Sequence, residues 1–326
     1  MRAGKLTPNE LKQFVINNVG AKRAEVIRGA AIGEDCGAFS IDGEILITSD
    51  PITAAGSNCG TLAMYISSND IAAAGGEPVI ATLTLMVPCD TAVEAIGGIM
   101  QDANNAARKL GVEIIGGHTE FTSAVVRPVV AVTMLGKAGT GFCRVNVGDD
   151  IVMTKSAGIE GAAILACDYG KALGLTDKDI ERAHTFTDML DVLPDSRIAM
   201  KAGGVCLMHD ITEGGVYGAI SELCFERGFG ASIDAAAIEV DELTARICAK
   251  LDINPYGLIS SGSLLIVCKD GNKIVSALEG ARIKGKIIGK ITNGDGAYAI
   301  QGTTRLKLEV ESDELLRAQA ILERNL

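Results

Sequence analysis

The order of strand-like and helix-like segments is the feature that most limits how this chain can fold. Short β-branched runs at 79–87 and 125–135 are mixed irregularly with helical stretches at 60–74 and 90–110. A regular β-α-β alternation would instead indicate one doubly wound parallel sheet. The same irregular mixture occurs in the second half of the chain. The sequence therefore predicts an α+β fold with two domains.

A polar, glycine-containing stretch at 139–150 separates the two halves. The chain has 326 residues, which is more than one ordinary hydrophobic core accommodates. We therefore expect one domain over residues 1–147 and a second over residues 148–326.

The charge and hydropathy of the chain exclude several classes of partner. The formal net charge is −11, which repels nucleic acid and anionic membrane surfaces. No apolar run is long enough to span a bilayer, and residues 1–10 lack the apolar core of a signal peptide. We expect a cytoplasmic protein that binds neither nucleic acid nor membrane.

Nine cysteines are present, and no two of them have the C-x-x-C spacing of a zinc or redox site. Several lie in apolar stretches, such as Cys167 and Cys268. We interpret them as buried thiols of a reducing compartment.

Acidic residues occur in glycine-containing turns and at expected strand ends. They are Asp35, Asp50, Asp70, Glu120 and Asp210, with Asp50 expected at the end of the strand 44–49. If they converge, their hard oxygen atoms would hold Mg²⁺, which in turn would carry phosphate. Taken singly, an aspartate in a turn is more often a helix cap or an Asx-turn. Spacing alone does not show convergence.

The segment Gly116-Gly117-His118-Thr119-Glu120 follows the expected strand 112–115, and we interpret it as a turn. Adjacent glycines allow backbone N–H groups to approach an anion closely, although they also suit any tight turn. His118 and His209 are each open to three roles: ligand, acid–base group or structural hydrogen-bonding residue.

Some local signals are structural. Thr7, Pro8 and Glu10 form the pattern of a capping box, and Asp90 is expected to cap a helix that ends near Leu110. The segment Gly280–Ile287 nearly matches a phosphate loop, but Ile287 replaces the required hydroxyl and a strand follows instead of a helix. We interpret it as a helix-to-strand turn with a basic flank.

The order of several short motifs resembles the aminoimidazole ribonucleotide synthetase (PurM-like) superfamily. This superfamily includes formylglycinamidine synthetase, selenophosphate synthetase, thiamine-monophosphate kinase and the hydrogenase-maturation factor HypE. The similar segments in the first half are Gly33-Glu34-Asp35-Cys36, Thr48-Ser49-Asp50, Asn69-Asp70, Ala74-Gly75-Gly76-Glu77-Pro78 and Gly116-Gly117-His118-Thr119-Glu120.

The resemblance continues into the second half and is greatest to the HypE-like branch. The similar segments there are Gly148-Asp149-Asp150-Ile151-Val152, His209-Asp210-Ile211-Thr212-Glu213-Gly214-Gly215, Asn254-Pro255-Tyr256-Gly257 and Ser260-Ser261-Gly262-Ser263-Leu264-Leu265. Each motif is weak alone, but their shared order is specific.

This resemblance implies two α+β domains, with ATP bound in a groove between the N-terminal domains of a homodimer. It implies ATP-binding roles for Asp50, Asn69, Asp70, Gly117 and Thr119. It implies Mg²⁺ ligands among Asp35, Asp50, Asp70, Glu120 and Asp210, and His118 and His209 become the catalytic candidates.

The expected function is ATP- and Mg²⁺-dependent activation of a small-molecule or protein-borne substrate through a phosphorylated intermediate. Two alternatives are aminoimidazole ribonucleotide synthetase itself and a non-catalytic nucleotide-binding protein that acts as a maturation partner. Residues 311–324 are expected to form a helix that docks through Leu315, Leu316, Ala320 and Leu322. The last cysteine is Cys268, so we do not expect a C-terminal thiol to carry the substrate group.

Overall fold

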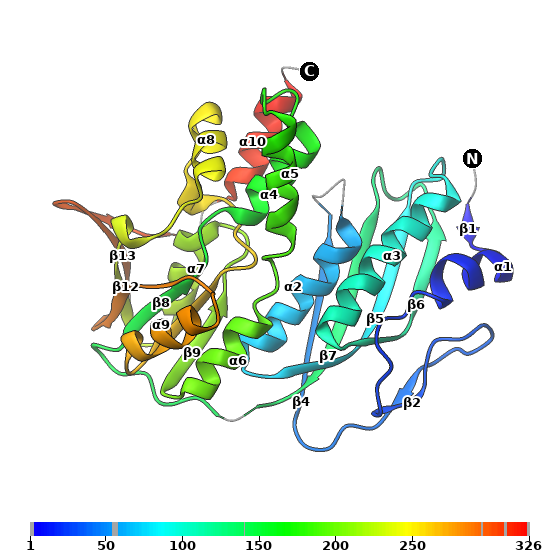
Figure 1. Cartoon of the computed structure of the whole chain (residues 1–326), viewed down its shortest axis with the longest axis horizontal. Coiled ribbons are helices and arrows are strands. Elements are labelled where there is room, and N and C mark those ends of the chain that lie inside the picture. Colours follow the sequence, from blue (N-terminus) through cyan, green and yellow to red (C-terminus); the bar gives the residue numbers. More distant parts are fainter. Residues whose placement is uncertain (1–2, 54–57, 140, 295, 310–311, 325–326) are drawn as a thin grey trace. The chain divides into compact units, whose positions relative to one another are not determined.

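The computed structural model describes residues 3–53, 58–139, 141–294, 296–309 and 312–324 (Figure 1). The chain forms two compact units. The first unit consists of Met1–Ala72 and Gly76–Gly139, and the second consists of Ala73–Gly75 and Thr140–Leu326. The connecting segment already belongs to the second unit at Cys143, whose backbone N–H donates to the Val205 carbonyl at 2.8 Å. The expectation about the C-terminal tail involves Asn325 and Leu326, which lie outside the described residues.

The first unit is built on a five-stranded sheet in the order β1-β6-β5-β7-β4. Its strands are β1 (Gly4–Lys5), β4 (Ile45–Ile52), β5 (Glu77–Val87), β6 (Glu113–Phe121) and β7 (Val129–Lys137). β5 and β6 are parallel, and the other neighbouring strands are antiparallel. The remaining elements are α1 (Pro8–Glu10), a π-helical turn (Leu11–Ile16), β2 (Val26–Arg28), β3 (Ala38–Phe39), α2 (Cys59–Ala73) and α3 (Val93–Leu110).

One face of this sheet is buried beneath helices. Buried and partly exposed residues alternate along β7 and along β5 from Ala81 onwards, as a sheet with one covered face requires. α2 and α3 lie across the covered face (Figure 1), where the Ser67 hydroxyl of α2 donates to the Val132 carbonyl of β7 at 3.3 Å. The other face, which includes Thr84, Ala131 and Ile47, is not the one that α2 and α3 cover, although near Leu135 the β2–β3 residues Val26 and Phe39 pack on Ile80 and Ile115.

The second unit contains a seven-stranded sheet in the order β14-β13-β10-β12-β8-β11-β9. Its strands are β8 (Asp150–Thr154), β9 (Val205–Asp210), β10 (Gly230–Asp234), β11 (Leu264–Cys268), β12 (Gly285–Thr292), β13 (Ala297–Gln301) and β14 (Thr304–Lys307). Its α-helices are α4 (Ile159–Tyr169), α5 (Asp177–Thr187), α6 (Leu193–Ala202), α7 (Gly215–Cys224), α8 (Glu242–Leu251), α9 (Gly271–Gly280) and α10 (Glu314–Glu323). Short 3₁₀ turns cover Ala235–Ala237 and Pro255–Gly257.

Both units mix helices with mainly antiparallel strands, so the α+β architecture expected from the sequence is confirmed. Within the described residues, no helix combines the length and the apolar character that crossing a membrane requires.

Several local predictions are confirmed and others are wrong. The capping box between Thr7 and Glu10 is present, and Gly280–Gly285 joins α9 to β12 as a helix-to-strand turn. Asp90 does not cap α3, because the chain makes a further turn and the helix begins after Ala92. Leu316 is 60% exposed and Ala320 is also exposed, because the buried stripe of α10 follows Leu315, Ala318 and Leu322 at helical spacing.

Candidate functional site

A cavity of about 410 Å³ in the first unit brings several predicted site residues together. The glycine loop 29–37 forms one wall, and residues 114–119 of β6 form another. Asp35, Gly117, His118 and Thr119 all line this cavity, as does Cys36. Asp35 and Thr119 are 84 positions apart in the sequence, and the fold brings them to the same cavity.

Glycine is required at the two points where this wall is closest to its neighbours. A Cβ atom on Gly117, whose φ is +151°, would lie 1.9 Å from the Leu83 carbonyl oxygen of β5. A Cβ atom on Gly37 would lie 2.6 Å from the Ile115 carbonyl oxygen of β6. The loop therefore packs directly on the strand, and the cavity wall at both glycines is bare backbone.

The segment Gly116–Glu120 is not a turn, as the sequence suggested, but the interior of β6. This segment is paired with β5 along its length. Gly117 is therefore needed because the β5 backbone lies so close to it, and not because the chain turns there. The side chains of a strand alternate, so His118 and Glu120 share one face and Thr119 lies on the other. His118 Nε2 is 3.2 Å from Glu120 Oε2, and Thr119 is buried.

Asp50 and Asp70 form a second cluster of predicted site residues. Asp50 is in the interior of β4, not at a strand end as expected, because the strand continues to Ile52 to pair with β7. The Thr48 hydroxyl contacts both carboxylates: it donates to Asp70 Oδ2 and lies 3.3 Å from Asp50 Oδ2. Asn69 precedes Asp70 in α2 and is fully buried.

The environment of Asp70 favours the protonated carboxyl. Burial raises the pKa of Asp70 to about 6 against the opposing hydrogen bond from Thr48, and the nearby Asp50 carboxylate raises it further. Two carboxylates held this close repel each other when both are ionised. The pair would therefore be stabilised by a shared proton or by a cation.

The expected acidic set is divided within one chain. β6 and β4 are separated by β5 and β7, so their backbones are about 14 Å apart, or three strand spacings. Asp35 and Glu120 are on the β6 side, whereas Asp50 and Asp70 are on the β4 side. In the parts of the chain that the structure describes, no three His, Cys, Asp or Glu side chains are grouped to hold a metal ion.

His209 and Asp210 lie in the second unit, at the end of β9. They point to opposite faces of the strand: Asp210 is buried, and His209 Nε2 is 3.2 Å from Glu222 Oε2 of α7. The loop that follows is fixed by Asp313, whose Oδ2 accepts a hydrogen bond from the Gly214 N–H at 2.7 Å.

Two notable residues of these regions were not predicted from the sequence. Cys36 is exposed and lines the first-unit cavity. Glu160 of α4 is 2% exposed, and burial raises its pKa to about 7, with Ser261 opposing the shift and Glu213 adding to it. Among the described residues, Glu160 Oε2 has no hydrogen-bond partner. A signal was available for Glu160, since it is the one charged residue in the apolar run Ile159–Cys167.

Family models match both units of the chain. The N-terminal domain of AIR synthase related proteins matches residues 33–138, and the C-terminal domain of the same family matches residues 146–301. The chain belongs to the AIR synthase related family. The PurM-like fold inferred from the motifs is therefore confirmed.

Curated relatives place the chain in the HypE-like branch of this family. It is 27% identical over 291 residues to carbamoyl dehydratase HypE of Rhizobium leguminosarum bv. viciae, covering 83% of this chain and 80% of that protein. It is 24% identical over 283 residues to a putative hydrogenase expression/formation protein of Methanocaldococcus jannaschii, covering 82% and 80%.

Solved structures show the same fold. Escherichia coli HypE has a TM-score of 0.81 at 18% identity, with 96% of this chain and 100% of that chain covered. A HypE protein in complex with ATP has a TM-score of 0.79 at 18% identity, with 97% of both chains covered. A HypE–HypF complex matches with a TM-score of 0.72 at 20% identity, covering 84% and 92%.

Proposed function

We propose that this protein is an ATP- and Mg²⁺-dependent enzyme of the HypE-like kind. In this proposal it phosphorylates an oxygen of a small-molecule or protein-borne substrate and so converts that oxygen into a leaving group. The observation that carries the proposal is the first-unit cavity, where a glycine loop and the bare backbone of β6 meet beside Asp35 and His118. The relative crystallised with ATP adds support through its fold.

The cavity suits an anionic ligand at its backbone wall. Gly33 and Gly116 also line the cavity, and the space beside them is open, so phosphate oxygens could reach the main chain there without obstruction by a side chain. Next to this wall, the imidazole of His118 is 3.2 Å from the Glu120 carboxylate, an arrangement that orients the ring. His118 would therefore be suited to proton transfer at the substrate.

Asp50 and Asp70 fit a Mg²⁺ ion better than the other predicted ligands do. Mg²⁺ usually takes one or two carboxylates from the protein and completes its coordination with phosphates and water. The Thr48 hydroxyl contacts both carboxylates, and a bound cation would offset the burial and the repulsion by Asp50 that raise the pKa of Asp70. When bound, the ion would neutralise charge on the ATP phosphates.

We further propose that the protein acts as a homodimer paired through the uncovered face of the first-unit sheet. Within one chain, about 14 Å of sheet separates Asp50 and Asp70 from the cavity. Ile47 of β4 is 67% exposed on that face, whereas Thr48 and Asp50 point to the face covered by α2. The HypE–HypF complex motivates a further proposal, that a maturation protein is a partner of this chain.

Thiol labelling tests the location of the nucleotide. Cys36 lines the cavity, whereas Cys143 is also exposed but belongs to the second unit and is not in the cavity wall. ATP with Mg²⁺ should slow the reaction of Cys36 with a maleimide and leave that of Cys143 unchanged, as read by peptide mass spectrometry. Equal rates at Cys36 with and without ATP would exclude this cavity as the nucleotide site.

ATP turnover separates an enzyme from a non-catalytic binding protein. We expect ADP formation that depends on Mg²⁺ and is accelerated by a carbamoyl-type substrate. His118→Gln should keep the Cys36 protection by ATP but reduce turnover by about a hundredfold, the scale of a lost general acid–base group. ATP protection without turnover under any of these conditions would favour the binding-protein alternative.

A further inference from the structure

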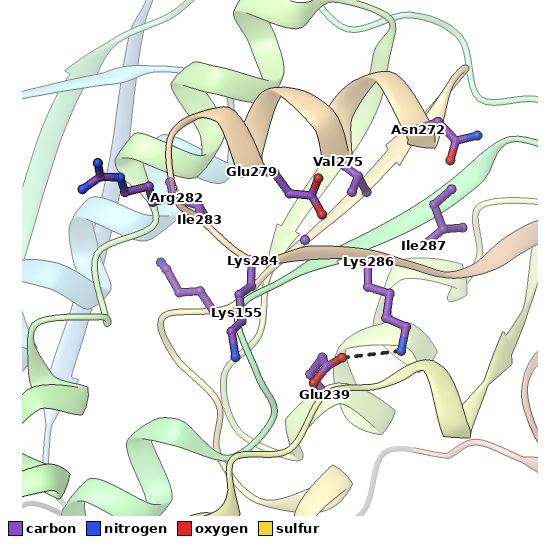
Figure 2. A pocket seen from close by; sticks show the side chains of 11 residues that line it. Lys155, Glu239, Asn272, Val275, Glu279, Arg282, Ile283, Lys284, Lys286 and Ile287 are labelled. Carbon is purple, nitrogen blue, oxygen red and sulfur yellow. Dashed lines mark hydrogen bonds and ion pairs between the residues drawn. The ribbon is translucent and has the colours of Figure 1, made fainter.

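The cations that line the cavities of this chain differ between the two units. A second-unit cavity of about 690 Å³ has several cations in its wall, but Lys286 is 3.5 Å from the Glu239 carboxylate. Figure 2 shows Arg282 pointing away from Lys284 and Lys286, so the cations of this wall do not converge. The first-unit cavity has one lysine or arginine among the described residues of its wall, and this residue is Lys5.

Lys5 belongs to an N-terminal segment that forms one side of the first-unit cavity. β1 pairs with β6, and the capping box at Thr7 leads into a π-helical turn, a conformation that is frequent at functional sites. Three residues of this turn also line the cavity: Leu11, Val15 and Ile16. The segment therefore provides an apolar wall with Lys5 at its start. The N-terminal family model matches from residue 33 onwards, so this wall lies outside the matched region.

The register of the sheet determines where the Lys5 side chain lies. Lys5 is paired with Glu120 of β6, and directly opposed residues of an antiparallel pair project from the same face. His118 lies two residues before Glu120, so it shares that face, and it lines the cavity. Diagonal neighbours of this kind are about 7 Å apart, within reach of a long side chain. The Lys5 ammonium and the His118 imidazole can therefore contact the same ligand.

The edge of β6 next to Lys5 provides backbone groups for the same ligand. Between the bridge of Gly20 with Glu113 and the start of the β1 pairing at Glu120, no described strand pairs with this edge. The cavity lies along this stretch and includes residues 114–119. An unpaired strand edge presents backbone N–H groups, and phosphate oxygens accept hydrogen bonds from such groups and from an ammonium.

Other cations lie near the glycine loop but are not in the cavity wall. Arg28 is 3.3 Å from the carboxylate of Glu34, which lines the cavity, and Lys22 is 2.6 Å from that of Glu113. The positive charge that the described wall itself supplies therefore comes from Lys5. A triphosphate carries several negative charges, so a cation placed here would matter for its binding.

We propose that Lys5 contacts the phosphate chain of ATP in this cavity and stabilises the phosphoryl group during its transfer. The inference rests on the proposed function, which places ATP here. In the transfer, a substrate oxygen bonds to the γ-phosphorus as the bond from that phosphorus to the β–γ bridging oxygen breaks, and ADP leaves with the bridging oxygen. Lys5 keeps its protons throughout and donates charge-assisted hydrogen bonds to the phosphate oxygens.

Two readouts test this role in the full chain: protection of Cys36 from a maleimide by ATP with Mg²⁺, and formation of ADP. Lys5→Gln removes the charge from an exposed side chain and leaves the backbone pairing of β1 possible. It should weaken ATP binding roughly tenfold, the effect of one lost charge-assisted hydrogen bond. It should also lower turnover at saturating ATP by about a hundredfold.

Two further variants separate charge from structure. Lys5→Arg keeps the positive charge and should recover part of the lost ATP affinity. Lys12→Gln is the matched control, because Lys12 is an exposed lysine of the π-helical turn that is not in the cavity wall. This variant should behave as the wild type does in both readouts.

The opposing results distinguish this inference from the proposed function. Equal ATP protection and equal turnover in the wild type and Lys5→Gln would overturn the role of Lys5 and leave the ATP site in place. A loss that Lys5→Arg does not reverse at all, or that Lys12→Gln reproduces, would also overturn it, because the charge at this position would not be the cause. No protection of Cys36 by ATP in the wild type would exclude the cavity as the nucleotide site and overturn both proposals.

Discussion

Asp70 in the first unit and Glu160 in the second are among the described carboxyl groups whose pKa is raised by burial. Burial raises the pKa of Asp70 to about 6 and that of Glu160 to about 7. They differ in surroundings: Asp70 shares the Thr48 hydroxyl with a second carboxylate, whereas Glu160 lies in an apolar helix. The first is arranged to exchange a proton for a cation, and the second to remain neutral in the folded state.

Glu160→Gln should change how stability depends on pH. The pKa of Glu160 is higher in the folded state than in the unfolded state, so its stabilising effect is complete below about pH 4.5 and is lost as the pH rises to about 7. The variant should therefore be more stable than the wild type at pH 8, by at most about 3 kcal/mol, and this advantage should shrink towards pH 5. Urea unfolding at both pH values measures it.

The control for this experiment is Glu181→Gln, on the exposed surface of α5. It should leave the pH dependence unchanged. If Glu160→Gln and the wild type lose stability equally between pH 5 and pH 8, Glu160 is ionised in the folded protein at neutral pH.

Asp70→Asn should abolish Mg²⁺-dependent ATP binding and leave the fold intact. The amide retains an acceptor for the Thr48 hydroxyl but removes the charge that a cation requires. Calorimetry with ATP, with and without Mg²⁺, measures the effect. Asp102→Asn is a matched control, because Asp102 is also a carboxyl in the first unit whose pKa is raised by burial, and it lies outside the cluster. Equal Mg²⁺-dependent affinity in the wild type and Asp70→Asn would remove Asp70 from the site.

At the level of secondary structure elements, the sequence correctly predicted features that depend on residues close together in the chain. The capping box at Thr7 depends on residues three positions apart, and the structure contains it. The glycines at 116 and 117 were misinterpreted as a turn because their reason is not local: β5 approaches so closely that no side chain fits. The division of the acidic set depends on strand order, which puts β5 and β7 between Asp50 and Glu120 and cannot be derived from spacing.

Gly117→Ala tests this explanation. The added Cβ atom would lie 1.9 Å from the Leu83 carbonyl oxygen, so β5 and β6 would have to separate. We expect a loss of about 2–3 kcal/mol in the free energy of unfolding, as in other overpacked sites. Gly98→Ala is the control: a Cβ atom there meets nothing within 4 Å, and α3 should gain about 0.5–1 kcal/mol. Equal melting temperatures for the two variants would contradict the close approach at Gly117.

At the level of the whole molecule, the uncovered face of the first-unit sheet is the candidate for pairing two copies. The sequence suggested the run 79–87 as the interface element. The corresponding strand β5 is central and paired on both edges, so only its uncovered side chains, such as Thr84, are available. Ile47 of β4 is 67% exposed on the same face. Exposed apolar side chains that lie next to one another on a sheet surface are typical of a protein–protein contact.

Light scattering at micromolar concentration should give the mass of a dimer for the wild type and that of a monomer for Ile47→Glu. The charge would have to be buried without a partner, which strongly disfavours association. Leu316→Glu, at a 60% exposed position of α10, should remain dimeric. A monomeric wild type, or a dimer unaffected by Ile47→Glu, would contradict pairing through this face.

The pairing of β6 with β5 also restricts where the chain can change its length. Removing one residue between Glu113 and Gly117 would exchange the faces of His118 and Thr119, because neighbouring strand residues point to opposite sides. The histidine would then be buried and the threonine would stand in its place. Insertions and deletions tolerated during evolution should therefore accumulate in the loops at 88–92 and 122–128 and be absent from β6, whatever substitutions that strand accepts.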